Sequence, residues 1–379
     1  MTRRYFLIKP ASGSCNMACR YCFYNDEGEN RSVRNYGMMD TTTSHALIDR
    51  AFADDDAYVG FGFQGGEPTL AGLDFFRDFV SYATSKAPRE RMSFSLQTNG
   101  YAIDGEWADF FKENGFLVGL SLDGSKKCHD LFRLDHGGNG TFKRVFNNAK
   151  LLQRAGVDFN ILVTTTRQVA SSIDELYPFF KRNGFNYLQF TPCIDPIASE
   201  RGSLDYSLTT ESFSKFLTTL FRLYHRDWKR GEYVSIRYFD NLISIMVRGW
   251  AEECGMNGVC GDYYVVEADG SVYPCDFYVL DGYKLGNILT DSFEDLDAKR
   301  DEIGFVEESR KLADECLYCR WRPLCRGGCK RDRQDFNSGK LGTSCFCEAY
   351  KAFFSECIGG LEEIAQAEAR ALRVNEARI

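Results

Sequence analysis

The chain contains no long hydrophobic run. In its 379 residues no uncharged apolar stretch approaches the roughly 20 residues that a membrane-spanning helix needs. The apolar run from Tyr5 to Ile8 ends at Lys9 and Pro10 and is too short for the core of a secretory signal. These absences predict a protein that has no membrane segment and stays in the cytoplasm.

An excess of positive charge is also missing. The chain carries 54 acidic and 46 basic residues, a formal net charge of −8, which argues against a nucleic-acid binder that neutralises phosphates. No segment is compositionally biased, because hydrophobic residues make up 44% and charged residues 26%, as in an ordinary globular protein. No coiled-coil seam is present either, so we expect a monomer.

Cysteine is abundant. Fifteen cysteines in a cytosolic chain are poor candidates for disulfides, because cellular reductants keep thiols reduced, so the leading interpretation is metal or iron–sulfur ligation. Twelve of them fall in three groups, and the other three, Cys128, Cys193 and Cys357, are isolated. The groups are Cys15, Cys19 and Cys22; Cys254, Cys260 and Cys275; and Cys316, Cys319, Cys325, Cys329, Cys345 and Cys347.

The first half of the chain alternates strand-like and helix-like patterns. Short apolar or β-branched runs predict six strands, at 5–9, 58–66, 92–100, 116–124, 158–166 and 187–195. Helical patterns between them, at 104–115, 141–156 and 171–184, end in glycine. This alternation predicts βαβ units and a parallel α/β sheet, open or closed into a barrel. Polar residues end five of the six runs, as at the active rim of parallel barrels, and the first cysteine group follows the first strand.

The pattern changes after about residue 200. Helical segments at 209–231 and 240–253 precede a cysteine-rich stretch with a hairpin pattern at 263–278. The last residues, 357–379, indicate one helix with a frayed end. We therefore predict two domains, residues 1–233 and residues 234–379.

The first cysteine group is one thiol short of a closed metal site. Three thiolates can hold three irons of a [4Fe–4S] cluster and leave the fourth iron open to a reactant, whereas a structural site closes with four ligands. The alternatives are a zinc site with a distant fourth ligand, or a trio without metal. Zinc ribbons supply paired C-x2-C units, and nothing near this trio forms such a pair.

C-x3-C-x2-C with Tyr21 before the last cysteine, directly after a first strand, resembles the radical S-adenosylmethionine superfamily. The stretch "GGEPT" at 65–69 is similar to that family's methionine-binding motif. The resemblance implies a partial (β/α)6 barrel whose open iron binds S-adenosylmethionine and cleaves it to a 5′-deoxyadenosyl radical. It also implies cofactor contacts, which would come from Tyr21, Gly66, Glu67, Ser121 and Ile194. A plain core role for Ile194 is equally compatible with the sequence.

The later cysteines resemble the SPASM extension, a cysteine-rich domain with two auxiliary clusters. The resemblance assigns the first cluster to Cys254, Cys260, Cys275 and Cys329, and the second to Cys316, Cys319, Cys325 and Cys347. Cys345 is an alternative to Cys347, which the spacing favours. The chain would then hold three [4Fe–4S] clusters.

Longer stretches, among them "LIKPASGSCNMACRYCFY", "FQGGEPTLAGLDFF" and "GSVYPCDFYVLD", resemble the anaerobic sulfatase-maturating enzymes over nearly the full chain. The resemblance implies oxidation of a Cys or Ser, in a C/S-x-P-x-R type motif of a sulfatase, to Cα-formylglycine without oxygen. In that mechanism the second electron leaves through the auxiliary clusters. The partners would be an unfolded or nascent sulfatase segment and an electron donor such as flavodoxin or ferredoxin.

The same resemblance gives roles to four further residues. Asp276, next to the cluster ligand Cys275, matches the general base, although a turn residue there is the plain alternative. Burial would have to raise its pKa for efficient proton transfer near neutral pH. Tyr24, Gln64 and Arg237 would contact the substrate peptide, and a structural salt bridge is the alternative for Arg237.

Two other functions fit the cysteine pattern. A different SPASM maturase, forming thioether or carbon crosslinks, often carries a peptide-binding domain before its barrel, and none fits before Cys15. An iron–sulfur electron carrier needs neither an open iron nor a polar rim. The stretch "CHDLFRLDHGG" at 128–138 suggests a metal site at first sight, but a solvated loop, with Arg133 reaching a carboxylate, is the better prediction.

Overall fold

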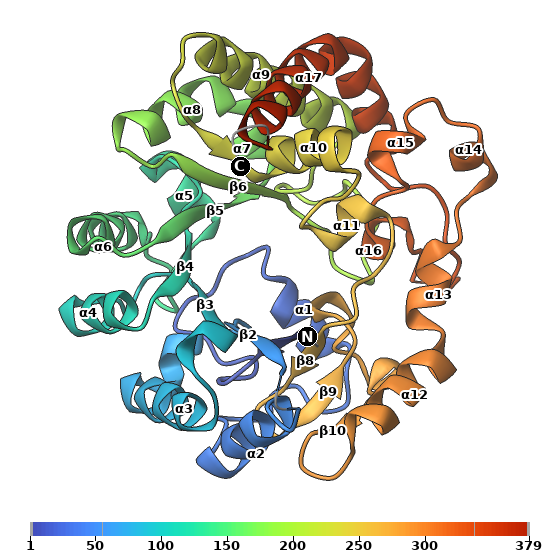
Figure 1. The fold of residues 1–379 in the computed structure, drawn as a ribbon. Helices are drawn as coiled ribbons and strands as arrows, with labels where there is room; N and C mark the ends of the chain where they lie inside the picture. Colours follow the sequence, from blue (N-terminus) through green and yellow to red (C-terminus); the bar gives the residue numbers. More distant parts are fainter. Residues whose placement is uncertain (1–2, 55, 337, 377–379) are drawn as a thin grey trace. The chain divides into compact units, whose positions relative to one another are not determined.

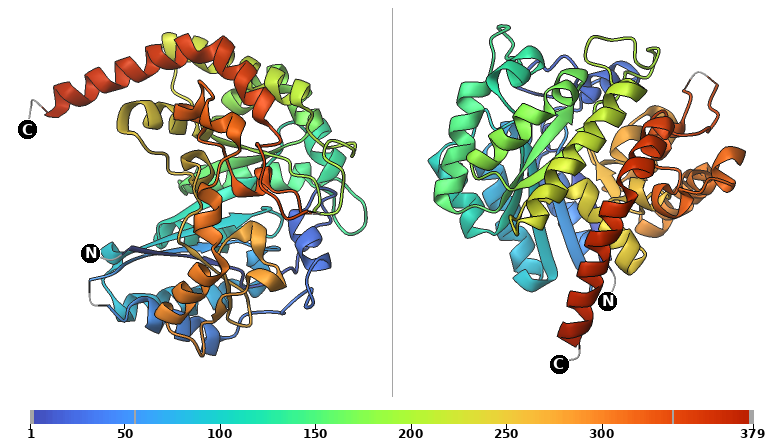
Figure 2. Two further views of the ribbon diagram at one scale, coloured as in Figure 1. Left: turned by 90° about the vertical axis from the view of Figure 1, so that its right-hand side faces the viewer. Right: turned by 90° about the horizontal axis from the view of Figure 1, so that it is seen from above.

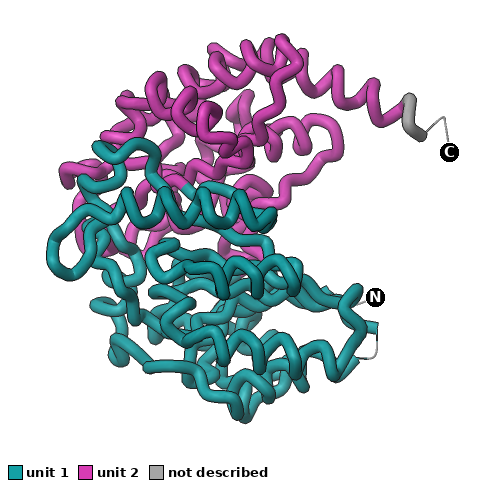
Figure 3. The backbone as a smooth tube through the Cα atoms, turned by 90° about the vertical axis from the view of Figure 1, so that its left-hand side faces the viewer, with its two compact units in different colours: residues 1–162, 262–305 teal, residues 163–261, 306–379 magenta. Residues whose placement is uncertain are grey.

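The computed structural model describes residues 3–54, 56–336 and 338–376. By compactness the chain divides into unit 1, residues 1–162 and 262–305, and unit 2, residues 163–261 and 306–379 (Figure 3). Each unit combines an early and a late part of the chain, so this division differs in kind from the domain boundary predicted after residue 233. That boundary stays a prediction.

Unit 1 is built on a parallel sheet whose strands follow the chain order β1-β2-β3-β4-β5 (Figure 1). All six predicted strands are confirmed. They are β1 Arg3–Ile8, β2 Tyr58–Phe63, β3 Met92–Thr98, β4 Phe116–Ser121, β5 Phe159–Thr165, which runs from unit 1 into unit 2, and β6 Tyr187–Pro192 in unit 2.

Helices connect these strands, and their ends follow local chemistry. They are α1 Phe23–Glu29, α2 Thr41–Ala51, α3 Leu73–Lys86, α4 Gly105–Glu113, α5 Lys126–Phe132 and α6 Phe142–Ala155. The Asp104 side chain caps α4 by accepting a hydrogen bond from the Trp107 N–H. Gly156 ends α6 with a left-handed φ of 67°, which glycine adopts without strain.

The late part of unit 1 adds strands on the other side of β1. The predicted hairpin is confirmed as the antiparallel pair β8 Tyr264–Val266 and β9 Ser271–Tyr273, followed by β10 Gly286–Asn287 and α12 Phe293–Ile303. β8 pairs in parallel with β1, with Ile8 opposite Val266. This pairing was not predicted, and it makes the sheet mixed. It also places the residues after β8 at the same edge of the sheet as the residues after β1.

Aromatic side chains fill the core beneath the sheet of unit 1. The rings of Phe6, Phe61, Phe94 and Phe116 are buried and stack in sequence across four neighbouring strands, with centroids 5.2–6.0 Å apart. Burying a phenylalanine contributes roughly 1.5–3 kcal/mol. This packing therefore fixes the positions of the strand ends, where the polar residues lie.

Unit 2 packs helices around β6 and the short strand β7 Ser235–Ile236. The long helix α17 Cys347–Glu376 lies along α9 Thr210–Lys229 and α10 Arg237–Arg248 (Figure 2). α17 begins at Cys347, before the predicted start at 357, and residues 377–379 of that prediction lie outside the described residues. The predicted helix at 171–184 is confirmed as α8 Ile173–Arg182, and the short helix α7 Arg167–Ser171 before it was not predicted.

The cysteine-rich part of unit 2 consists of single helical turns and loops. Its helices are α11 Cys254–Asn257, α13 Phe305–Arg310, α14 Asp314–Leu317, α15 Arg322–Cys325 and α16 Lys330–Arg333. Cys254 begins α11, Cys325 ends α15 and Cys316 lies within α14, so ligation of these cysteines would fix the segment. In the described ranges, no helix combines the length and the apolar character needed to cross a membrane.

Candidate functional site

The three-cysteine loop joins β1 to α1. Its thiols are partly buried, and the Cys15 Sγ accepts weak hydrogen bonds from the Met17 N–H at 3.4 Å and the Asn99 amide at 3.5 Å. Burial raises the pKa of Cys15 to about 11 and that of Cys19 to about 12, and it raises the pKa of Cys22 as well. A bound cation opposes this effect by stabilising the thiolates, and thiolates are the ligands of iron–sulfur clusters, so this donor set fits iron.

The turn after β2 lies directly against this loop. The Gly66 N–H donates to the Ser12 carbonyl at 2.8 Å, and the Glu67 N–H donates to the Ser14 carbonyl at 2.7 Å. A Cβ on Gly66 would lie 2.1 Å from the Ser14 oxygen, and Gly65 has a φ of 115°. Only glycine fits either position, so the Gly-Gly pair lets the end of β2 approach the cysteine loop.

The Glu67 carboxylate links the ends of two strands. It is 1% exposed and accepts hydrogen bonds from the Thr69 N–H at 3.1 Å and hydroxyl at 2.7 Å, the Thr98 hydroxyl at 2.8 Å and the Asn99 N–H at 2.8 Å. Burial raises its pKa, and these donors oppose that shift. Glu67 therefore supports the rim from within, and the cofactor contacts of Gly66 and Glu67 stay a prediction.

Tyr21, the aromatic residue of the cysteine motif, is anchored beyond the end of β4. Its hydroxyl donates to Asp123, whose carboxylate also accepts from the Arg133 Nε at 2.9 Å. The Arg133 guanidinium lies 5.4 Å from the centre of the Tyr21 ring. All three side chains are buried, so they fix the segment between Cys19 and Cys22 against β4.

Helix α5 corrects the prediction of a solvated loop at 128–138. His129 is fully buried; its Nδ1 accepts from the Asp123 N–H at 3.3 Å, and its Nε2 donates to the Thr141 hydroxyl at 3.0 Å. Burial lowers its pKa to about 4, so the ring is neutral. The predicted contact of Arg133 with a carboxylate is confirmed. The prediction of a solvated loop is wrong for residues 128–133. Their polar character suggested exposure to solvent, but in the folded chain the polar side chains form hydrogen bonds with one another and with neighbouring residues.

Asp276 lies in unit 1 with two of the residues predicted to bind substrate. It is 6% exposed, and its Oδ2 accepts from the Tyr24 hydroxyl at 2.8 Å and the Gln64 amide at 2.5 Å. Its Oδ1 is buried and has no hydrogen-bond partner among the described residues. Burial raises the pKa of Asp276. A carboxylate with one oxygen held and the other free is arranged to take up a proton.

A buried charge network behind Asp276 was missed by the sequence reasoning. Lys9 follows β1 and is 1% exposed; its Nζ lies 3.2 Å from Glu267 and 3.6 Å from Glu27. Arg31 reaches Glu267 at 2.7 Å, and the charge of Lys9 lowers the pKa of Asp276 against the effect of burial. The one available signal was Lys9 itself, a charge placed directly after an apolar strand.

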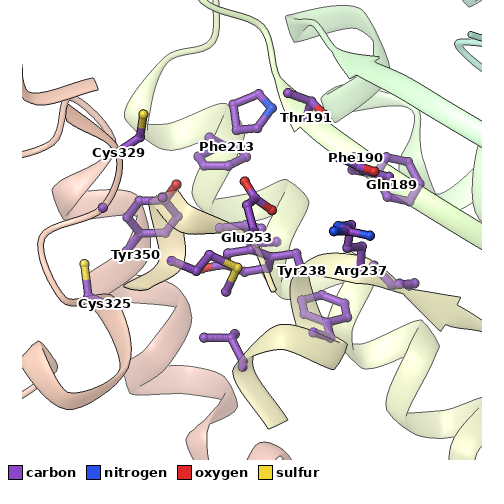
Figure 4. A pocket seen from close by; sticks show the side chains of 18 of the residues that line it. Gln189, Phe190, Thr191, Phe213, Arg237, Tyr238, Glu253, Cys325, Cys329 and Tyr350 are labelled. Carbon is purple, nitrogen blue, oxygen red and sulfur yellow. The ribbon is translucent and has the colours of Figure 1, made fainter. Parts of the chain in front are cut away.

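Arg237, which was predicted to contact the substrate peptide, lines a cavity of about 90 Å³ in unit 2 (Figure 4). Gln189 and Thr191 of β6 face it together with Arg237, the first residue of α10, and Tyr238. Arg237 also lies 3.4 Å from Glu252, so the salt bridge considered as the alternative is present. Its contact with a peptide stays a prediction.

Two other predicted contact residues are less informative. Ser121 is the last residue of β4 and is half-buried. Ile194 follows β6, is half-buried and does not line the cavity beside β6. The cofactor contacts of both stay predictions.

Four cysteines of unit 2 line one cavity. They are Cys316, Cys319, Cys325 and Cys347, the set predicted for the second auxiliary cluster. Cys345 does not line it, and its thiol instead accepts a hydrogen bond from the Arg201 guanidinium at 3.0 Å. The wall also includes three aromatic residues, Trp321, Tyr350 and Phe354, and three charged residues, Glu315, Arg322 and Lys351.

The cysteines predicted for the first auxiliary cluster are divided between the units. Cys254, Cys260 and Cys329 belong to unit 2, and Cys275 belongs to unit 1. Gly255 lets α11 approach Cys329, because a Cβ on Gly255 would lie 3.3 Å from the Cys329 Cβ. In unit 1 the Tyr263 hydroxyl donates to the Cys275 thiol at 3.3 Å.

No three Cys, His, Asp or Glu side chains in the described part of the chain converge on one metal ion. A four-iron cube holds its thiolates farther apart than one zinc ion does.

Comparison with known families agrees with this reading of the two cysteine regions. Residues 10–178 match the radical SAM superfamily, and residues 254–320 match an iron–sulfur cluster-binding domain. The fold and its thiols thus define a radical S-adenosylmethionine enzyme with an added iron–sulfur domain.

Individual relatives narrow the class. The chain is 44% identical, over 95% of its length and 96% of the relative, to the cysteine-type anaerobic sulfatase-maturating enzyme of Clostridium novyi. It is 29% identical, over 96% of its length and 87% of the relative, to a serine-type enzyme of Klebsiella aerogenes. The structure described as native anSMEcpe with bound AdoMet and Kp18Cys peptide matches with a TM-score of 0.91 at 42% identity, covering 96% of this chain and 99% of that one. The chain belongs to the family of anaerobic sulfatase-maturating enzymes.

Proposed function

We propose that this protein oxidises a cysteine of a sulfatase polypeptide to Cα-formylglycine under anaerobic conditions. The observation that carries the proposal is Asp276, a buried carboxylate whose Oδ2 is held by Tyr24 and Gln64 while Oδ1 has no described partner. Cysteine is preferred over serine as the target, because the identity is 44% to a cysteine-type relative and 29% to a serine-type relative.

The cofactors are S-adenosylmethionine and three [4Fe–4S] clusters. Cys15, Cys19 and Cys22 hold the cluster that binds S-adenosylmethionine, and together these groups supply a 5′-deoxyadenosyl radical when bound. Tyr21, Gly66, Glu67, Ser121 and Ile194 contact the bound S-adenosylmethionine.

The two auxiliary clusters take four protein ligands each. The first is held by Cys254, Cys260, Cys275 and Cys329, and the second by Cys316, Cys319, Cys325 and Cys347. The position of Cys347 in the four-thiol cavity, with Cys345 turned to Arg201, supports Cys347 as the last ligand.

Asp276 moves the proton in this reaction. The substrate CH2–SH group loses a hydrogen atom from Cβ, a proton from sulfur and one electron, which together convert it to a thioaldehyde. Oδ1 of Asp276 accepts the proton, while Tyr24 and Gln64 hold Oδ2 and so orient the carboxylate. Water then replaces sulfur and releases the aldehyde with hydrogen sulfide.

The substrate is an extended, unfolded or nascent segment of the sulfatase. Tyr24, Gln64 and Arg237 contact its backbone or side chains. An electron donor such as flavodoxin or ferredoxin supplies the reducing equivalent, and the protein works as a cytoplasmic monomer.

The test is anaerobic incubation of the reconstituted protein with S-adenosylmethionine, dithionite and a peptide containing C-x-P-x-R. We expect a loss of about 18 Da from the peptide, with one 5′-deoxyadenosine per oxidised cysteine. Formation of 5′-deoxyadenosine with an unchanged peptide mass would contradict the proposal. A serine peptide of the same sequence is the matched control and should react more slowly.

A further inference from the structure

A basic groove lies beside the four-thiol cavity in unit 2. It has a volume of about 840 Å³, and its wall includes Arg310, Arg320, Arg322 and Arg326 together with Cys319. The chain as a whole has a net charge of −8, so this concentration of arginines is a local exception.

The charge of the groove is hardly neutralised. Arg320 stacks on Trp321 at 4.4 Å, and Arg322 and Arg326 donate to backbone carbonyls at 3.4 Å and 2.9 Å. Among the described residues, Arg310 alone of the four has a carboxylate within ion-pair distance, Glu307 at 3.5 Å, and both side chains are exposed. Exposed ion pairs are weak and screened, so the groove keeps a positive potential.

Cys319 connects the groove to the four-thiol cavity. It lines both hollows and is partly exposed, and Arg322 also lines both. The thiol-lined site therefore reaches solvent on the side of the arginines. Electron exchange across a protein surface needs a short separation, and Cys319, which lines both hollows, provides one at the groove.

An exposed apolar anchor lies next to the arginines. Tyr318, between Cys316 and Cys319, is 90% exposed, and Leu317 is 43% exposed. Protein interfaces use such aromatic anchors within a polar rim, and redox partners bind through small surfaces of this kind. Of the acidic residues on α14, Asp314 and Glu315 do not line the groove, and Glu315 lines the four-thiol cavity instead.

We propose that this groove docks an acidic one-electron carrier protein of the flavodoxin or ferredoxin type, with Tyr318 as its apolar anchor. The inference rests on the proposed function, in which the substrate gives up a hydrogen atom, a proton and one electron. The oxidised carrier takes up that electron and becomes reduced. The sulfatase segment is excluded as the occupant, because its motif carries an arginine that the groove would repel.

The experiment is a binding titration of the holoprotein with a purified, oxidised, acidic bacterial flavodoxin, followed by its flavin fluorescence in 50 mM NaCl. We expect the double variant Arg310→Glu/Arg320→Glu to bind about tenfold more weakly than the parent protein. In 300 mM NaCl the difference should shrink to about twofold, because salt screens the charges. Tyr318→Ser should weaken binding in both salt concentrations alike.

The control is Arg154→Glu/Arg182→Glu, which reverses two exposed arginines on α6 and α8. It changes the net charge by the same amount and should leave the affinity within about twofold. Equal affinities of the groove variant, the control and the parent protein would overturn the proposal, as would equal weakening by both double variants.

Two further readouts separate this test from the function and from folding. Dithionite needs no docking, so peptide oxidation driven by dithionite reports the proposed function on its own. Iron content shows whether a variant has kept its clusters. If the double variant loses iron, Arg310→Glu alone, on a helix that carries no cysteine, replaces it and should bind about threefold more weakly.

Discussion

The three-thiol loop of unit 1 and the four-thiol cavity of unit 2 both present cysteine thiols as possible metal ligands. The residues around the thiols differ between the two sites. The loop is held by polar contacts, through the backbone of Gly66 and the buried pair Tyr21 and Asp123. The cavity is lined by thiols with Trp321 and Phe354 among the wall residues. The polar contacts around the loop suit the polar reactant predicted for it, and the four thiols of the cavity suit the closed set of protein ligands predicted there.

Removing one thiol from the loop should have the largest effect. We expect Cys19→Ala to abolish 5′-deoxyadenosine formation, because two thiols cannot retain the cluster that binds S-adenosylmethionine. About eight of twelve iron atoms should remain, held by the auxiliary sites. Iron analysis and chromatography of the nucleoside check both results. Retained 5′-deoxyadenosine production would show that the loop is not the reactive site.

Asp276→Asn should separate radical formation from substrate oxidation. We expect formylglycine formation to fall by about 10²- to 10⁴-fold, because the amide cannot take up the thiol proton. The 5′-deoxyadenosine yield should persist. Tyr24→Phe, which removes one hydrogen bond to Oδ2 and leaves the carboxylate, should lose about tenfold or less. Equal losses in the two variants would assign Asp276 a structural role instead.

The cavity can be tested with a pair of neighbouring cysteines. Cys347→Ala should lower the iron content by about four atoms, whereas Cys345→Ala should leave it unchanged, since Cys345 lies beside Arg201. Both variants carry the same chemical change two positions apart in the chain, so each is the control for the other. Loss of iron in Cys345→Ala but not in Cys347→Ala would show that Cys345, and not Cys347, is the cluster ligand.

Acid should lower the stability of the region around His129, which supports Asp123 and so the three-thiol loop. This effect should be smaller than those of the cysteine and Asp276 variants. The pKa of His129 falls from 6.5 to about 4 on folding, so between these values the unfolded chain binds the proton and the folded chain does not. The contribution of neutral His129 to the free energy of unfolding is fully present above pH 6.5. It declines as the pH falls toward 4, by up to about 3 kcal/mol. The groups facing the ring are Asp123, Asp130, Arg133 and Lys126.

Anaerobic urea unfolding at pH 7, 6 and 5 measures this decline. His129→Gln should be less stable than the parent at pH 7, because it breaks the link between the Asp123 N–H and Thr141. It should lose less stability on acidification. An unchanged pH dependence would show that another group is protonated.

The sequence predicted the strands well, because each is a short apolar run bounded by turn residues. The resemblance to the SPASM extension implied the set of four thiols in unit 2, and their spacing favoured Cys347 over Cys345 as its last member. It could not predict that β8 pairs with β1, because pairing between residues so distant in the chain leaves no local periodicity. That pairing places Glu267 beside Lys9 and brings Asp276 to Tyr24.

Buried polar side chains were the other gap. Lys9 and His129 look solvated in the sequence, because only the folded chain supplies their partners. The arginines of the basic groove are spread over 17 residues from Arg310 to Arg326, so their common surface also emerged only from the fold.

The contrast between an open and a closed thiol site can be tested directly by electron paramagnetic resonance of the reduced protein with and without S-adenosylmethionine. We predict that the cofactor changes one cluster signal in the parent protein. In a variant with alanine at Cys15, Cys19 and Cys22, the signals of the auxiliary clusters should remain and should not respond to the cofactor. A response to S-adenosylmethionine in that variant would contradict the account.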